Sequence, residues 1–95
     1  MVSFLVRMRF ANDDRARVNE AVLKATEASR KEPGCVTYVP HWTEAEADTL
    51  VIYEQYIDTA AHEAHRASAH FQEYVIGGLY QMMRERAVEN LSAIL

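Results

Sequence analysis

The sequence predicts an α+β domain of the ferredoxin-like type, in which split βαβ units form an antiparallel sheet. Three observations predict this class: an alternating strand at the start, two amphipathic helical stretches, and the order strand, helix, strand, strand, helix, strand. A chain of 95 residues is long enough for one domain, so residues 1–95 are taken as a single unit.

The first strand and helix follow from the hydrophobic period. Residues 2–10 alternate as a strand does, with one apolar face made of Val2, Phe4, Val6, Met8 and Phe10. Asn12 or Asp13 can cap the helix that follows, and Val18, Ala21, Val22 and Ala25 recur in it at helical spacing. Lys31 and the breaker Pro33-Gly34 then mark its end.

The second half of the chain repeats the pattern. Residues 35–42 and 49–57 are predicted strands, and the acidic stretch 43–48 connects them. Asp58 or Thr59 can cap a helix through about Ala67, and Ser68 can cap a continuation that bends at Gly77-Gly78. Residues 87–95 alternate more weakly and are predicted as the last strand.

The third predicted strand is apolar on both faces, whereas the helices of this fold cover only one face of the sheet. A monomer would therefore expose an apolar surface, and we expect a homodimer that packs sheet against sheet. One face of the strand carries Leu50, Ile52 and Tyr56, and the other carries Val51, Tyr53 and Ile57.

Charge and composition exclude several classes of partner. The net charge is -4 and the ten Lys and Arg residues are scattered among fourteen acids, so nucleic-acid binding is not expected. No segment approaches membrane-spanning length, and Met1–Arg7 does not resemble a secretory leader, so we expect a cytoplasmic protein without a membrane partner. The single cysteine, Cys35, agrees with a reducing compartment.

Three of the four histidines, His62, His65 and His70, fall within nine residues and follow Glu54 on the preceding strand. A neutral imidazole beside a carboxylate can act as a general base, because the hydrogen bond fixes its tautomer and raises its basicity. A buried carboxylate is costly unless it has a partner, so a functional role for Glu54 is favoured. The alternative is that the histidines are solvated surface residues.

Two structural alternatives accompany this hypothesis. Glu54 can instead form an ion pair with Arg7 or Arg9 across the sheet. Asp58, His62 and His65 stand at helical spacings of four and three, but a fourth ligand and a known metal motif are missing from this stretch, so no metal site is predicted.

Three strings of residues resemble the antibiotic biosynthesis monooxygenase (ABM) domain family, which includes the quinol monooxygenases. The resemblance runs over essentially the whole chain. It implies a dimeric α+β barrel with a pocket in each subunit, where members oxidise quinols or polycyclic phenols with molecular oxygen and without flavin, haem or metal. The strings are Glu32-Pro-Gly-Cys-Val-Thr-Tyr38, Ile52-Tyr-Glu-Gln-Tyr56, and Ala64-His65 with Ala69-His70-Phe71.

The resemblance also implies roles for individual residues. His65 or His70 would take the proton of a phenolic substrate, and Glu54 would orient that histidine. The substrate would be a small aromatic or phenolic compound, with molecular oxygen as the second reactant and no cofactor. Substrate contacts are expected from Tyr38, Tyr56 and Phe71, with His62 in a secondary role.

Related branches of the family leave alternatives. A haem-degrading branch has a tryptophan where His65 stands and an axial histidine near Tyr74 or Val75, so haem is disfavoured. A branch that isomerises a small phosphorylated signalling sugar has a similar strand and two-histidine pattern, and stays open as an alternative. A third alternative is a dimer that binds a small ligand without catalysis.

Overall fold

Four strands form one antiparallel sheet in the order β2-β3-β1-β4 in the computed structural model, which describes residues 1–94. This order is that of the ferredoxin-like fold, so the predicted α+β class is confirmed. The elements are β1 (Val2–Arg9), the 3-10 turn η1 (Asn12–Asp14), α1 (Arg15–Ser29), β2 (Cys35–Trp42), β3 (Thr49–Tyr56), α2 (Thr59–Ala67), the π-helix η2 (Phe71–Leu79), α3 (Tyr80–Met82) and β4 (Glu85–Leu91).

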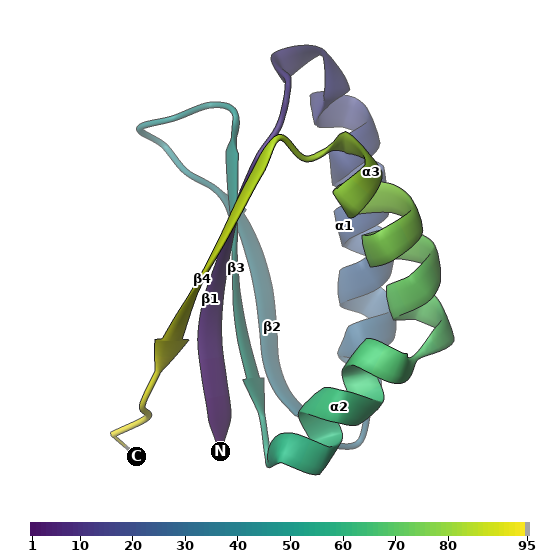
Figure 1. Cartoon of the computed structure of the whole chain (residues 1–95), viewed down its shortest axis with the longest axis vertical. Helices are drawn as coiled ribbons and strands as arrows, with labels where there is room; N and C mark the ends of the chain where they lie inside the picture. The colour runs from purple at the N-terminus through teal and green to yellow at the C-terminus, as the bar shows by residue number, and fades with distance from the viewer. Residues whose placement is uncertain (95) are drawn as a thin grey trace.

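All the helices lie on one side of this sheet (Figure 1). α1 runs along the sheet beside η2, and α2 closes the end of the layer near the start of β1 (Figure 1). We call the helix-covered side the inner face and the opposite side the outer face. No helix of residues 1–94 covers the outer face, as the prediction of one-sided helices required.

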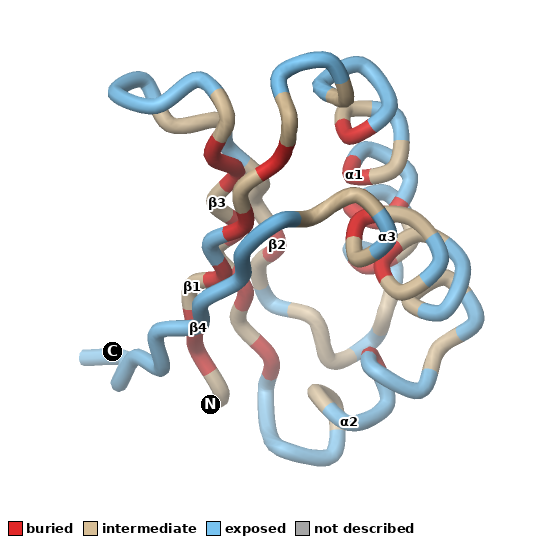
Figure 2. The backbone as a smooth tube through the Cα atoms, turned by 45° about the horizontal axis from the view of Figure 1, so that its top comes forward, coloured by how far each residue is buried: buried red, intermediate tan, exposed pale blue. Residues whose placement is uncertain are grey.

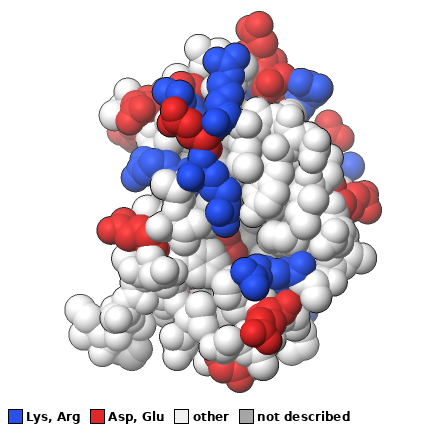
Figure 3. All heavy atoms as spheres, in the orientation of Figure 1, with Lys and Arg blue, Asp and Glu red and all other residues white. Residues whose placement is uncertain are grey.

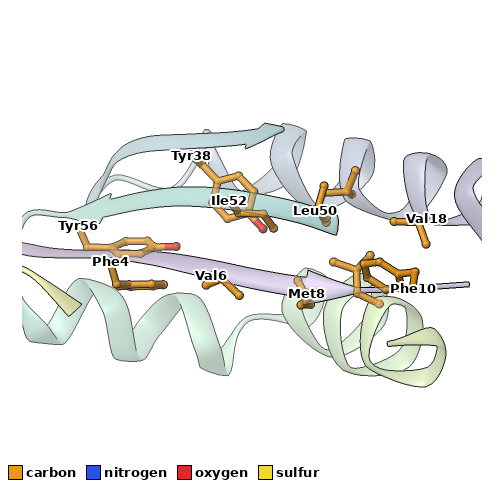
Figure 4. Packing of buried hydrophobic residues seen from close by; sticks show 11 residues of the cluster. Phe4, Val6, Met8, Phe10, Val18, Tyr38, Leu50, Ile52 and Tyr56 are labelled. Atoms are coloured by element: carbon orange, nitrogen blue, oxygen red, sulfur yellow. The ribbon is translucent and has the colours of Figure 1, made fainter. Parts of the chain in front are cut away.

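The core is built from inner-face residues of the two central strands. Antiparallel register places Val6 opposite Ile52 and Met8 opposite Leu50, so these side chains point to the same side of the sheet. Figure 4 shows the row that they form with Phe4 of β1, Phe10 just after β1, and Val18, which belongs to α1. All of these residues are buried, which confirms the face predicted from the alternation of residues 2–10.

The helix caps agree with the prediction at α2 but not at α1. Asp58 precedes α2 and accepts a hydrogen bond at 2.8 Å from the backbone N–H of Ala61. The predicted cap at Asn12 or Asp13 is wrong, because these residues lie inside η1. Asp14 precedes α1, where its carboxylate pairs with Arg17, and within residues 1–94 its side chain bonds no helix N–H.

The second helical region also departs from the predicted bend at Gly77-Gly78. Ser68 accepts a hydrogen bond from the N–H of Phe71, and the chain then adopts π-helical hydrogen bonding through Leu79. A Cβ atom at Gly77 would lie 3.1 Å from the carbonyl oxygen of Gln72, so a glycine suits this widened turn. Among the helices of residues 1–94, none is long and apolar enough to cross a membrane.

The last strand is shifted from its predicted position. β4 begins at Glu85 and ends at Leu91, whereas residues 87–95 were expected, and Leu95 lies outside the described residues. β4 is an edge strand that pairs with β1, and all its residues are exposed (Figure 2). Exposure of a whole strand explains its weak hydrophobic alternation, because few of its side chains contribute to the core.

Candidate active site

A cavity of about 310 Å³ lies between the inner face of the sheet and the helices that follow β3. Its volume is at the lower end of the range for small-molecule sites. Much of its wall is apolar, and the carboxyl, imidazole and guanidinium groups come from β3, α2 and β4. The apolar wall is made of Phe4, Val6, Met8, Ile52, Phe71, Val75 and Leu79.

Glu54 places a carboxyl group in the wall of this cavity. It sits on the central strand β3, in register with Phe4 of β1 and Tyr38 of β2, and is 5 % exposed. The Tyr56 hydroxyl donates a hydrogen bond of 2.6 Å to its Oε1 atom. Burial raises the pKa of Glu54 from 4.5 to about 7, although the hydrogen bond from Tyr56 opposes this rise. Glu54 is therefore divided between its neutral and ionised forms near pH 7.

The alternative prediction, an ion pair of Glu54 with Arg7 or Arg9, is wrong. Arg7 and Arg9 lie on the opposite face of β1 from the residue paired with Glu54, and Arg9 forms its ion pair with Glu85 of β4 at 2.7 Å. The carboxyl group of Glu54 instead faces the ring of His65, with 3.6 Å between Oε1 and Nε2.

His65 is the buried residue of α2, with 3 % of its side chain exposed. Its Nδ1 atom lies 2.8 Å from Oε2 of Glu32, and its Nε2 atom faces Glu54 and the cavity. A carboxylate can only accept, so the contact with Glu32 fixes the proton on Nδ1 and leaves the Nε2 lone pair free. Burial lowers the pKa of His65, and Glu32 opposes this shift. The lowered pKa favours the neutral form of the ring.

Glu32 is the residue that sequence reasoning missed. It lies in the turn between α1 and β2, and its Oε2 atom also lies 2.5 Å from Nε2 of His70. A side chain on Gly34 would collide with Ala61 of α2, so glycine allows this turn to approach α2 closely and brings Glu32 beside His65. No sequence period connects a turn residue with a histidine on a later helix, and only the Glu32-Pro-Gly string pointed to this position.

His70 contacts Glu32 and therefore acts on the site through that carboxylate. Within residues 1–94 His70 does not line the cavity, and its ring lines a separate surface groove on the helix side with Lys24, Lys31 and Tyr74. The structure brings the predicted pair His65 and His70 together through the shared oxygen of Glu32, with a different role for each ring.

The four predicted substrate-contact residues fall into two groups. Tyr38, His62 and Phe71 line the cavity. Tyr56 is fully buried, and in residues 1–94 it lies behind the wall, where it binds Glu54. The ring of His62 stacks at 5.2 Å on Tyr56, and burial lowers its pKa, so it adds a largely neutral aromatic surface. The edge of Phe71 contacts His65 at 5.2 Å between ring centroids.

One group of residues has the ligand types for a divalent cation. One atom each of Glu32, His65 and His70 lie within 4.8 Å of one another, which is the two-histidine, one-carboxylate type of set. This set differs from the one weighed in the sequence, because Asp58 is used as the cap of α2. The separations of 2.8 and 2.5 Å are hydrogen-bond distances, so we describe the group as a carboxylate shared by two imidazoles.

Comparison with known proteins gives the family. The family profile described as antibiotic biosynthesis monooxygenase matches residues 1–76, and no curated protein matches the chain. The fold resembles a candidate antibiotic biosynthesis monooxygenase from Nitrosomonas europaea, at 22 % identity and a TM-score of 0.92 over 100 % of both chains.

Two other solved structures have the same fold. A candidate antibiotic biosynthesis monooxygenase from Bacteroides thetaiotaomicron is 24 % identical, with a TM-score of 0.90 over 99 % of this chain and 90 % of its own. A Mycobacterium tuberculosis protein is 24 % identical, with a TM-score of 0.88 over 98 % and 94 % of the two chains. The profile match over four fifths of the chain, joined to this common fold, places the chain in the antibiotic biosynthesis monooxygenase family.

Proposed function

We propose that the protein is a cofactor-independent monooxygenase that oxidises a small quinol, anthrone or similar phenolic compound with molecular oxygen. The observation that carries the proposal is the placement of His65. Its Nδ1 atom is held by Glu32, and its free Nε2 atom faces an apolar cavity lined by aromatic rings. An oriented neutral imidazole in such a cavity is suited to take a proton from a phenol.

The first step is proton transfer from the substrate hydroxyl to Nε2 of His65. The carboxylate of Glu32 then stabilises the imidazolium ion, as the acid does in a catalytic triad. The phenolate is electron-rich, and its ring carbon forms a bond to molecular oxygen, after which the imidazolium ion of His65 returns its proton to the peroxide to give a hydroperoxide. Loss of water breaks the O–O bond, so the substrate supplies every electron and the products are a quinone and water.

Glu54 has a complementary task in this mechanism. Because its pKa is about 7, it can carry a proton next to His65 at neutral pH. That proton can pass to the leaving oxygen when the O–O bond breaks. His65 takes the proton released as the C–H bond of the same carbon breaks, and passes it on to Glu54. Two neighbouring titratable groups with opposite pKa shifts are the usual arrangement of an acid and base pair.

The apolar floor of the cavity favours a flat phenolic ring over the hydroxyl-rich ring of a phosphorylated sugar, although Arg66 and Arg86 in its wall suit a phosphate as well as a carboxylate. A sugar would bury several hydroxyl groups against Phe4, Ile52 and Leu79, which offer no hydrogen-bond partner. A flat aromatic ring matches such a wall. The non-catalytic binding dimer is disfavoured because His65 is buried with a lowered pKa and faces the cavity.

The proposal is tested by oxygen uptake with chelator-treated protein and a panel of hydroquinones and anthrones. We expect His65→Ala/His70→Ala to lower the rate by about 100-fold or more, the usual effect of losing a general base. His41→Ala is the matched control, because His41 is exposed on β2 away from the cavity. A double variant with the rate of the wild type would rule out this assignment, and silence of the wild type across the panel would rule out the substrate class.

A further inference from the structure

We propose that Arg66 and Arg86 form an anion-binding clamp at the mouth of the cavity, and that the preferred ligand is an aromatic compound with a carboxylate substituent. The aromatic class rests on the proposed function. The clamp itself is argued from the two arginines.

The two arginines reach the cavity from different elements. Arg66 belongs to the last turn of α2, and Arg86 belongs to the edge strand β4, yet both contribute to the same cavity wall. Arg86 is in register with Met8 of β1, so its side chain lies on the inner face. Both residues are exposed overall, which places their charged ends at the solvent side of the cavity rather than at its apolar floor.

Neither guanidinium group forms an ion pair within residues 1–94, although the charge of Arg86 acts on Glu54 in the same cavity and opposes the rise that burial causes in its pKa. Several other basic side chains of the protein have a partner: Arg9 pairs with Glu85, and Arg17 pairs with Asp14. Arg15 and Arg30 donate to the carbonyl oxygens of Ala47 and Tyr38. Arg66 and Arg86 make no such contact within the described part of the chain, so their N–H groups are free to bind a ligand.

The local charge runs against that of the whole chain. The net charge is -4, but the mouth of the cavity carries two cationic groups. Figure 3 shows Lys and Arg atoms on both sides of a hollow on this face, with acidic atoms recessed between them. The two cations outnumber the one carboxyl group that lines the cavity in residues 1–94, Glu54, which is partly neutral near pH 7, so they can attract an anion. Planar guanidinium groups can bind a carboxylate through paired hydrogen bonds.

The position of Arg86 is further fixed by an aromatic ring. Its guanidinium carbon lies 5.5 Å from the centroid of Tyr80, which also lines the cavity. Stacking of this kind restricts the arginine side chain and leaves its N–H groups available. A ligand held by Arg86 and Arg66 would place its anionic group at the mouth and its ring between Phe71 and the sheet, next to His65.

The test compares two ligands that differ only in the anionic group, naphthol and its carboxylated analogue hydroxynaphthoate. Binding is measured by calorimetry without turnover, so the result does not depend on oxygenation. We expect the wild type to bind hydroxynaphthoate at least about 10-fold more tightly than naphthol, the size expected of one charge-assisted contact. This preference should fall with added salt, because the clamp is exposed to solvent.

The arginine variants decide whether the clamp is the cause. Arg66→Gln and Arg86→Gln should each reduce the preference for hydroxynaphthoate several-fold, the double variant should abolish it, and naphthol affinity should stay unchanged. Arg84→Gln is the control, because Arg84 is exposed in the turn before β4 and, within residues 1–94, does not line the cavity. Equal affinity for the two ligands, or a preference that survives the double substitution, would overturn the proposal. Failure of the oxygen-uptake assay alone would leave it standing.

Discussion

The two faces of the sheet have similar sequence patterns but different surroundings. On the inner face, Val6, Ile52 and Leu50 are at most 5 % exposed, because the protein's own helices cover them. On the outer face, Leu5, Tyr53 and their neighbours are partly exposed. Register places these side chains in one apolar row across the sheet, which we call the outer patch: Leu5, Val39 and Tyr53, with Val51 next to Tyr53 along β3.

The difference teaches that hydrophobic alternation predicts which face is apolar, but not what covers it. The inner face has a cover within the chain, together with a cavity that contains the polar groups Glu54 and His65. The outer patch has no cover in residues 1–94, and an apolar row on the central strands is costly to leave in water. We therefore propose that a second copy covers it in a homodimer, which is the interaction predicted from the two-sided strand.

The largest expected effect comes from placing a charge in the outer patch. Tyr53→Glu would bury an unpaired carboxylate between Leu5 and Val39 in the dimer, so we expect a monomer that keeps its own inner core. The dimer dissociation constant should rise by about 100-fold or more, for a cost of about 3 kcal/mol. Light scattering coupled to size-exclusion chromatography measures the mass.

Leu23→Glu provides the control for that experiment. Leu23 is 62 % exposed on α1, on the helix side of the molecule, and should tolerate a charge without change of mass. A Tyr53→Glu protein that keeps the mass of the wild-type dimer would exclude the outer patch as the interface. A wild type that is monomeric at all concentrations would exclude the dimer.

Much of the fold could be predicted because short-range periodicity determines it. The alternation of residues 2–10 and 49–57 predicted both central strands to within one residue of the observed ends, and also their inner faces. The widened turns of η2 were not predicted, because π-helical bonding depends on how the segment packs, and its apolar stripe is equally compatible with an α-helix.

The site was predicted only in part for a similar reason. Glu54 and His65 carry local signals, since one interrupts an apolar strand and the other belongs to a histidine cluster. Glu32 and Arg86 have no such signal, because a turn and an exposed edge strand bring them to the site from distant positions in the sequence. Their roles depend on tertiary contacts that residue spacing does not encode.

A smaller effect is expected on the free energy of unfolding, from the buried carboxyl group of Glu54 on the inner face. The pKa of Glu54 is about 7 in the folded protein and 4.5 without the effect of the fold. As the pH rises, Glu54 therefore ionises in the unfolded chain before it does so in the folded protein. The stability that Glu54 contributes is thus fully present below about pH 4.5 and is lost as the pH rises through about 7. The loss amounts to about 3 kcal/mol, from about 1.4 kcal/mol per pKa unit.

Glu54→Gln isolates this contribution, because glutamine does not ionise and can still accept the Tyr56 hydrogen bond. The stability of the variant relative to the wild type should increase between pH 5 and pH 8 by up to about 3 kcal/mol. Urea denaturation at several pH values measures the two free energies of unfolding. A difference that does not vary with pH would contradict a raised Glu54 pKa.

The smallest effect concerns an unpaired hydroxyl group on the same inner side. Ser29 ends α1 and is fully buried, and its Oγ atom has no hydrogen-bond partner in residues 1–94. Ser29→Ala removes this unsatisfied group and should stabilise the protein by about 1 kcal/mol, or a rise in Tm of about 4–8 °C. Thr26→Val is the matched control, because the Thr26 hydroxyl donates to the carbonyl oxygen of Val22 at 2.7 Å. Its loss should not raise Tm. If Ser29→Ala lowers Tm instead, the hydroxyl group has a hydrogen-bond partner in solution, such as a buried water molecule at this end of α1.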